Sequence, residues 1–297
     1  MIGPGLAGVL PLLACPHCES ALGRSDDRVV GCRSGHRFDV ARQGYLSLLG
    51  KTSRTDTGDS ADMVQARATF LSAGHYQSLA SAIAALVTAD PVLEIGAGTG
   101  YYLAAVLRGL ADSTFTARGL AVDASRYAAR RAAADPGIGS IVADAWSRLP
   151  VRDGAVGAVL SIFAPRDPSE IARVLRAGGR AVVVTPEPDH LGEIRSPLGL
   201  LAVDPGKPDR LAEAFAGRLR PAGRLPFRSR MALTRGDVDA LVRMGPSARH
   251  LDRDRLGEAI RRLTGRTDVT LSVTVSVLEK RGTGSSTGAA DESLGVQ

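Results

Sequence analysis

The clearest pattern along this 297-residue chain is an alternation of short apolar runs with segments of helical periodicity between residues 91 and 186. Apolar runs predict strands at 92–95, 117–122, 140–143, 155–163 and 180–185. Apolar positions three and four residues apart predict helices at 101–110, 124–134 and 168–175. Strands that alternate with helices are typical of a parallel, doubly wound α/β sheet, which binds ligands at the carboxyl ends of its strands.

The flanking segments predict what covers and completes this sheet. Residues 61–87 show helical spacing interrupted at Gly74, which predicts two covering helices, the first capped by Ser60. After residue 186 the pattern breaks at several prolines, which predicts a basic insertion over 186–226. A strand at 227–233, a helix at 236–243 and an alternating strand at 269–278 then complete the core. We therefore predict a module at 1–50, a main domain at 51–280 and a disordered tail at 281–297.

The most informative motif follows the first predicted strand. Gly96, Gly98 and Gly100 occupy alternate positions between that strand and a helix. Such glycines let the backbone turn sharply and let a ligand approach, while the helix N-terminus favours the ligand's negative end. The spacing differs from the Gly-x-Gly-x-x-Gly of dinucleotide-binding folds, which argues against an NAD dehydrogenase. It resembles the first motif of S-adenosylmethionine (SAM) methyltransferases, so we expect SAM as the cofactor.

Acidic residues follow the next two predicted strands. Asp123 is placed to accept hydrogen bonds from ribose hydroxyls, and Asp144 to accept from the adenine amine, with Ala145 or Trp146 packing nearby. Either carboxylate could instead cap a helix. The predicted cofactor-binding residues are Glu94, Gly96, Gly98, Thr99, Gly100, Tyr101, Asp123, Asp144 and Ala145.

All three cysteines fall within the first 32 residues. Cys15 and Cys18 form a Cys-x2-Cys pair, and Cys32 and His36 a Cys-x3-His pair. Two close thiolate and imidazole pairs are typical of tetrahedral Zn²⁺, and four ligands leave no open position, so the predicted zinc is structural. His17 is an alternative to His36, but it lies between two ligands and is expected to point outward. Unrelated buried thiols are the alternative interpretation.

The charge is unevenly distributed. The chain carries a net charge of +6, and residues 205–266 contain 15 basic and 7 acidic side chains. Such an excess is typical of a phosphate-facing surface. Base composition would explain arginine in place of lysine, but not this uneven placement. No apolar stretch approaches the roughly 20 residues of a membrane span, and residues 1–14 lack the basic start of a signal peptide, so we expect a cytoplasmic protein without membrane association.

Several short motifs together resemble the bacterial 23S rRNA (guanine-N1)-methyltransferases, in particular the tylosin- and mycinamicin-resistance type. The motifs are Cys-Pro-His-Cys at 15–18, Gly-His-Arg-Phe-Asp at 35–39, Arg-Gln-Gly-Tyr at 42–45, Gly-Asp-Ser at 58–60 with Met63, Arg67 and Phe70, Gly-His-Tyr at 74–76, Gly-Thr-Gly-Tyr-Tyr at 98–102 and Ile-Phe-Ala-Pro at 162–165. The resemblance implies methyl transfer from SAM to a guanine N1 in a 23S rRNA hairpin at the peptide exit tunnel, and with it macrolide resistance. It also implies structural zinc on Cys15, Cys18, Cys32 and His36, and a homodimer.

Catalytic residues are harder to predict. The fourth predicted strand ends in Phe163-Ala164-Pro165, without the Asp/Asn-Pro-Pro-aromatic motif of amino-methylating enzymes, which suits a ring-nitrogen target. Phe163 is a candidate to stack on a flipped base, or a core aromatic residue. His75, Asp59 and Asp167 are candidate general bases, and each is also compatible with an ordinary surface position. Two other functions remain open: a SAM enzyme acting on a small molecule, and a non-catalytic zinc-containing RNA-binding protein.

Overall fold

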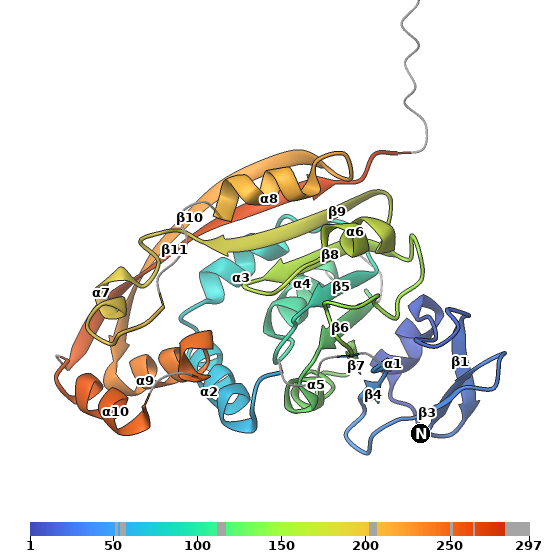
Figure 1. The fold of residues 1–297 in the computed structure, drawn as a ribbon, viewed down its shortest axis with the longest axis horizontal. Helices are drawn as coiled ribbons and strands as arrows, with labels where there is room; N and C mark the ends of the chain where they lie inside the picture. The colour runs from blue at the N-terminus through green and yellow to red at the C-terminus, as the bar shows by residue number, and fades with distance from the viewer. Residues whose placement is uncertain are drawn as a thin grey trace, which may run out of the picture.

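The computed structural model describes residues 1–50, 53, 58–111, 117–201, 207–249, 252–263 and 265–282. Its centre is an eight-stranded sheet in the order β10-β11-β9-β8-β5-β6-β7-β4 (Figure 1). These strands are β4 (Leu46–Ser47), β5 (Val92–Ile95), β6 (Gly119–Asp123), β7 (Ile138–Val142), β8 (Val156–Ile162), β9 (Leu175–Pro186), β10 (Arg220–Thr234) and β11 (Arg266–Glu279). The strands from β4 to β9 are parallel, and β11 runs antiparallel to both of its neighbours.

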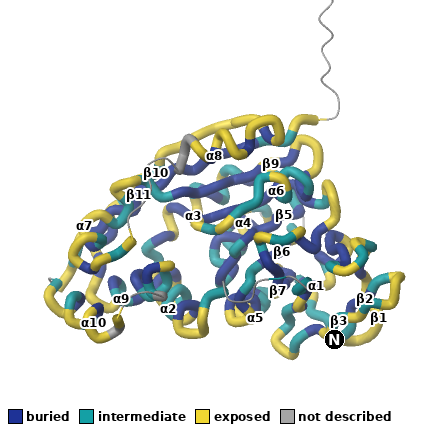
Figure 2. The backbone as a smooth tube through the Cα atoms, in the orientation of Figure 1, coloured by how far each residue is buried: buried dark blue, intermediate teal, exposed yellow. Residues whose placement is uncertain are grey.

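Helices cover both faces of this sheet. On one face lie α2 (Ala61–Ser72), α3 (Gln77–Ala84), α4 (Tyr101–Ala111), α5 (Arg126–Ala132), α7 (Gly192–Arg195), α9 (Arg235–Arg243) and α10 (Arg253–Arg261). On the other lie α1 (Pro4–Val9), α6 (Pro168–Val174) and α8 (Lys207–Phe215). The side chains of successive strand residues pack into buried clusters on opposite faces of the sheet: Val92 packs on the first face, and Leu93 on the second. The central strands are therefore buried on both sides, as parallel sheets require, whereas α8 is largely exposed (Figure 2).

The N-terminal segment forms a second, small sheet beside the large one. Its antiparallel strands are β1 (Leu22–Asp26), β2 (Val29–Cys32) and β3 (Arg37–Asp39), and two short 3-10 helices elsewhere span Leu10–Leu12 and Pro246–Arg249. Helix α1 and strand β4 lie within the predicted module of residues 1–50, yet both pack on the large sheet. Gly5 approaches Ile138 so closely that a Cβ would lie 2.4 Å from its carbonyl oxygen, and β4 pairs with β7. The boundary at residue 50 stays a prediction.

Local sequence signals account for several element ends. Strand β5 has the predicted bounds, and Ser60 Oγ accepts a hydrogen bond from Met63 N at 3.3 Å, as expected of the cap of α2. The prolines after residue 186 do not all break the sheet, because β10 begins at Arg220 and runs through Pro221 and Pro226. A sheet edge tolerates proline because the missing N–H would face solvent. Helices α1, α7, α8 and α10 were not predicted; α1 is too short to show helical periodicity, and α7 and α8 lie in the segment predicted to be an insertion.

The polar residues that alternate along β11 are buried rather than exposed to solvent. Thr270, Ser272 and Thr274 alternate with valine and leucine, which predicts a solvent-facing side, but these residues are buried. Each binds the segment before or in α7: Thr270 Oγ1 lies 2.5 Å from Glu193, the Ser272 N–H donates to His190 Nδ1 at 3.3 Å, and Thr274 Oγ1 bonds Glu187. The polar side of β11 thus holds residues 187–195 against the sheet.

No helix among the described residues is long and apolar enough to cross a membrane. Most of the predicted tail, residues 283–297, lies outside the described part of the chain.

Candidate functional site

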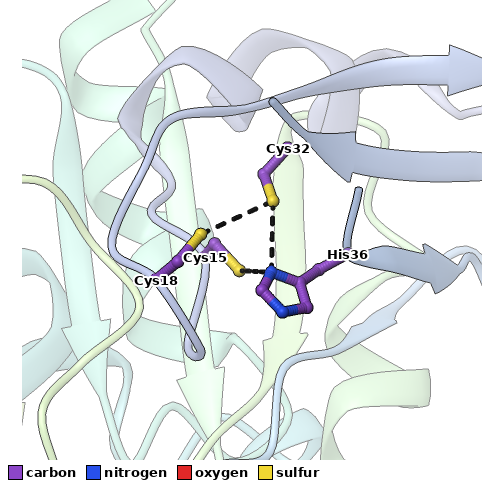
Figure 3. Close-up of side chains that lie close together, drawn as sticks. All are labelled: Cys15, Cys18, Cys32 and His36. Atoms are coloured by element: carbon purple, nitrogen blue, oxygen red, sulfur yellow. Dashed lines mark hydrogen bonds between the residues drawn. The ribbon is translucent and has the colours of Figure 1, made fainter. Parts of the chain in front are cut away.

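The four predicted metal ligands come together at the edge of the small sheet (Figure 3). Cys18 Sγ lies 3.6 Å from Cys32 Sγ, and His36 Nδ1 lies 3.5 Å from Cys15 Sγ and 3.4 Å from Cys32 Sγ. All four ligand atoms fall within 4.8 Å of one another. Zn–S bonds of about 2.3 Å in a tetrahedron place ligand sulfurs roughly 3.8 Å apart, so the set fits Zn²⁺.

The surroundings of the cluster act in opposite directions on its thiols, and His17 lies outside it. Hydrogen bonding from Ser20 lowers the pKa of the Cys18 thiol to about 5, whereas burial raises the pKa of Cys15 to about 11. His17 does not join the cluster; its exposed ring stacks on Phe38 with centroids 5.8 Å apart. With four protein ligands and no open position, the site is structural.

The glycine turn after β5 forms the second site. Gly96 and Gly98 have φ angles of +66° and +54°, the left-handed region that glycine enters freely. A Cβ on Gly96 would lie 2.6 Å from the Ala164 Cβ, and one on Gly98 would lie 3.1 Å from Arg67 Cδ. Side chains from distant segments therefore close over the turn, and any Cβ there would push them away.

Two carboxylates hold this turn in place. Asp123 Oδ2 accepts from Gly98 N at 2.8 Å, and its Oδ1 accepts from Ser125 N at 2.8 Å. Glu94 Oε2 accepts from Leu103 N at 3.1 Å in the first turn of α4. Burial raises the pKa of Glu94 to about 8 and also raises the pKa of Asp123. Glu94 is thus a buried support of the turn.

Together these elements enclose the glycine-turn pocket. Its lining residues are Gly58, Asp59, Arg67, Gly96, Gly98, Asp123, Ala124, Asp144, Ala145, Trp146, Ile162, Phe163, Ala164 and Pro165. Five of the nine predicted cofactor-binding residues are among them. Thr99, Gly100 and Tyr101 lie in the turn and at the start of α4 but not in this lining, and Glu94 lies beneath it. Asp144 accepts from Trp146 N at 2.9 Å and from Ser147 Oγ at 3.0 Å, so it also shapes the loop after β7.

A larger cavity of about 680 Å³, which we call the arginine pocket, adjoins the first. Both are lined by Arg67, Trp146, Phe163, Ala164 and Pro165. The lining of the arginine pocket adds Arg166, His190 and Arg195, and it contains no aspartate or glutamate. A volume of this size is typical of ligand sites.

Phe163 lies where the two pockets meet. Its φ of +53° is rare for a residue with a side chain, and it turns the chain out of β8. The ring is 39% exposed, with its centroid 5.7 Å from that of His190 and 6.3 Å from that of Tyr76. Trp146, the other large aromatic residue on the shared wall, is 57% exposed. Two aromatic surfaces therefore face the solvent at the mouth of the site.

The candidate general bases occupy other roles. Asp59 forms an ion pair with Arg67 at 2.6 Å, and Asp167 caps α6 by accepting from Ser169 N at 2.8 Å. His75 Nε2 lies 3.2 Å from Asp237 Oδ1, and His75 is absent from the lining of both pockets. Among the three, Asp59 alone reaches a pocket.

Sequence reasoning overlooked three polar residues of this site. Arg67 was noticed only as part of a motif, Arg166 directly follows the Phe-Ala-Pro turn, and His190 lies in the segment interpreted as an insertion. The position of Arg166 after a strand end was a usable signal. The sequence around His190 contained no such signal, because only the contact of His190 with β11 brings it to the pocket.

The strand order, the glycine turn after β5 and the acidic residues after β6 and β7 define a methyltransferase-type doubly wound sheet joined to an N-terminal zinc ribbon. A zinc-ribbon family model described as RlmA, N-terminal, matches residues 13–54. The chain is 46% identical over 277 residues to the 23S rRNA (guanine(748)-N(1))-methyltransferase of Streptomyces fradiae, covering 91% of this chain and 97% of that one.

A protein of Micromonospora griseorubida, provisionally named a 23S rRNA (guanine-N(1)-)-methyltransferase, is 43% identical over 289 residues, covering 89% of this chain and 96% of the relative. A solved structure from Bacillus halodurans, provisionally named a methyltransferase, aligns with a TM-score of 0.46 and 14% identity, covering 65% of this chain and 93% of that one. The chain belongs to the 23S rRNA (guanine-N1)-methyltransferase family.

Proposed function

We propose that this protein transfers the methyl group of SAM to N1 of a guanine in 23S rRNA. The observation that carries the proposal is that the glycine-turn pocket and the arginine pocket share a wall that includes Arg67, Trp146 and Phe163. A donor in the first pocket and a base in the second would meet at this wall. The names of the curated relatives supply the substrate, since both specify guanine N1 in 23S rRNA.

The residues of the glycine-turn pocket suit SAM. Each Asp123 oxygen accepts one backbone N–H and keeps a further lone pair, which ribose hydroxyls would use. Arg67 Nε is buried without a hydrogen-bond partner among the described residues, beside Gly98, where the carboxylate of the methionine moiety would satisfy it. Asp144 would accept from the adenine amine. SAM itself supplies an electrophilic methyl group, so no covalent nucleophile is needed.

The aromatic residues at the shared wall suit an extruded base. N1 lies on the pairing edge of guanine, so the target must be unpaired or flipped out of its stack. Stacking on an aromatic ring contributes about 1–3 kcal/mol per base, and Phe163 and Trp146 offer exposed rings. Holding N1 in line with the methyl group is the larger contribution, because positioning can supply roughly 7–11 kcal/mol of the barrier.

The physiological role that we propose is macrolide resistance, exerted in the cytoplasm by methylation of an exit-tunnel hairpin. A methyl group on that guanine would hinder macrolide binding. Expression in a susceptible bacterium that lacks this modification should raise the inhibitory concentration of macrolides but not that of antibiotics bound elsewhere. We further propose a homodimer, for which a doubled mass in sedimentation equilibrium is the expected result.

Methyl transfer is tested with purified protein, SAM carrying a labelled methyl group and 23S rRNA that lacks the modification. We expect label in the RNA and one strong primer-extension stop, because N1-methylguanine cannot pair. Binding of SAM without label in any RNA would contradict the proposal. It would favour a SAM enzyme that acts on a small molecule.

A further inference from the structure

The arginine pocket has an unusual distribution of charge. Three guanidinium groups line it, and no carboxylate does. Two of the three are held by an ion pair or by several hydrogen bonds: Arg67 pairs with Asp59, and Arg195 donates to the carbonyl oxygens of Pro188 (2.7 Å) and His190. The third, Arg166, donates one hydrogen bond within the described part of the chain, from Nη1 to the carbonyl oxygen of Ala164 at 3.2 Å.

Arg166 is therefore a half-buried cation without an acidic partner in the described part of the chain. Its burial lowers the pKa of the guanidinium, which is the effect of removing a charge from water. Withdrawing a charge from water without an opposite charge nearby is costly, and a ligand that brings electron density to the guanidinium would offset that cost. The pocket as a whole is thus suited to an electron-rich or anionic group.

His190 adds a neutral donor to the same cavity. Burial and the nearby Arg195 lower its pKa to about 4, so the ring is uncharged at neutral pH. Nδ1 accepts the Ser272 N–H, and the single ring proton of the neutral tautomer therefore lies on Nε2. In that tautomer His190 has no free lone pair, so it can donate a hydrogen bond to a ligand but cannot take a proton from one.

We propose that the arginine pocket binds the target guanine by its O6 edge, and that Arg166 is a catalytic residue which stabilises the anion formed when N1 loses its proton. This inference rests on the proposed function. Arginine matches the acceptor pair O6 and N7 of guanine in a bidentate fashion. His190 would position the base by packing against Phe163 and donating to the same edge.

The reaction step balances without a protein carboxylate as base. The N1 proton leaves to solvent hydroxide, and the negative charge is shared between N1 and O6 beside Arg166. The N1 lone pair then forms the new N–C bond to the methyl carbon as the C–S bond breaks. Its electron pair stays on sulfur, which gives neutral S-adenosylhomocysteine and neutral N1-methylguanine.

This assignment makes a protein general base unnecessary. The arginine pocket lacks acidic side chains in its described lining, and Asp59 in the adjoining pocket is neutralised by Arg67. The charged and titratable groups that line the cavity are Arg67, Tyr76, Arg166, His190 and Arg195. Tyr76 is buried with a raised pKa, so it stays a phenol, and the remaining groups are cations or donors. Electrostatic stabilisation of the product of proton loss takes the place of a base.

The test is the pH dependence of single-turnover methyl transfer to 23S rRNA, with full-length protein. In R166Q we expect the rate at neutral pH to fall about 100-fold or more, as when one oxyanion donor is removed. We also expect the pH at which the rate levels off to rise by roughly 1–3 units, the shift that loss of a nearby opposite charge produces. R118Q is the matched control, because exposed Arg118 pairs with Asp90 at the other end of β6.

A second variant keeps the test decisive if R166Q binds SAM poorly. R166K retains the positive charge but not the planar fork, so we expect a smaller loss of rate and a smaller displacement of the pH profile. An R166Q profile of wild-type shape, or an R166K rate equal to that of the wild type, would overturn the role of Arg166 while leaving the proposed function intact. Absence of methylated guanine with the wild-type protein would instead remove the proposed function itself.

Discussion

The zinc ribbon and the pair of pockets at the strand ends are held together in opposite ways. The four metal ligands lie within 22 residues of sequence, between Cys15 and His36, on a sheet of three short strands. The pocket walls come from segments between Gly58 and Ser247 and rest on strands buried on both faces. The ribbon thus combines a few strong bonds to one ion with the packing of Leu22 and Val30 beside the large sheet, whereas the pockets depend on many weak contacts across the whole fold.

Removal of zinc should show the largest effect. Structural zinc contributes an apparent 10–16 kcal/mol to small zinc modules. In C32S, or after chelation, we expect loss of bound metal and rapid proteolysis between residues 19 and 31, while the large sheet stays folded. Metal analysis and mass spectrometry of the fragments measure this. Simultaneous unfolding of the large sheet would show that the two regions are not independent.

Gly96→Ala should damage the strand-end site almost as much. The new Cβ would be strained by the left-handed backbone at this position and would lie 2.6 Å from the Ala164 Cβ, effects that together cost roughly 2–5 kcal/mol. We expect reduced thermal stability and at least about a 100-fold loss of SAM affinity by calorimetry. Gly109→Ala in α4 is the control, since its Cβ would meet ordinary contact at 3.7 Å. That variant should gain up to about 1 kcal/mol.

Glu94 should make the stability of the sheet depend on pH. Because folding raises the pKa of Glu94 from its ordinary value of 4.5 to about 8, its stabilising contribution is complete below pH 4.5 and disappears as pH rises through 8. We expect Glu94→Gln to remove a decline of a few kcal/mol in the free energy of unfolding between pH 5 and pH 8.5. Urea unfolding at both pH values measures the free energy of unfolding. Equal declines in the wild type and in Glu94→Gln would contradict the prediction.

Phe163→Gly should separate activity from stability. Loss of the ring removes a stacking surface worth about 1–3 kcal/mol, so we expect kcat/KM for rRNA to fall roughly 10- to 100-fold. Relief of the positive φ offsets part of the lost packing, so Tm should change little. Tyr127→Ala is the matched control, because Tyr127 is also 39% exposed but lies on α5. An equal loss of activity in both variants would remove the role of Phe163.

The sequence predicted the parts of the molecule that local patterns encode. The metal ligands were recognisable because the Cys-x2-Cys and Cys-x3-His spacings are typical of a zinc site. Strand β5 and the glycine turn were recognisable because a strand followed by alternate glycines is typical of a ligand-binding turn. The prolines in β10 misled because an edge strand permits proline. The alternation in β11 correctly predicted a strand but not that residues 187–195 bury its threonines. The local pattern alone gives no information about the solvent at the edge of β10 or about residues 187–195 beside β11.

The division between sequence and tertiary structure is clearest at the active site. The sequence by itself determined the fold class, the zinc ligands and the placement of acidic residues at the end of β6 and after β7, because each is encoded by a repeating or closely spaced pattern along the chain. Only the tertiary structure decided that Asp59 is neutralised by Arg67, that His75 is drawn away by Asp237, and that Arg166 and His190 share a cavity without carboxylates. The charge state and accessibility of a side chain depend on what packs against it. A local pattern does not reveal those neighbours, whether they lie 8 residues away, as Arg67 does from Asp59, or in a distant segment, as Asp237 does from His75.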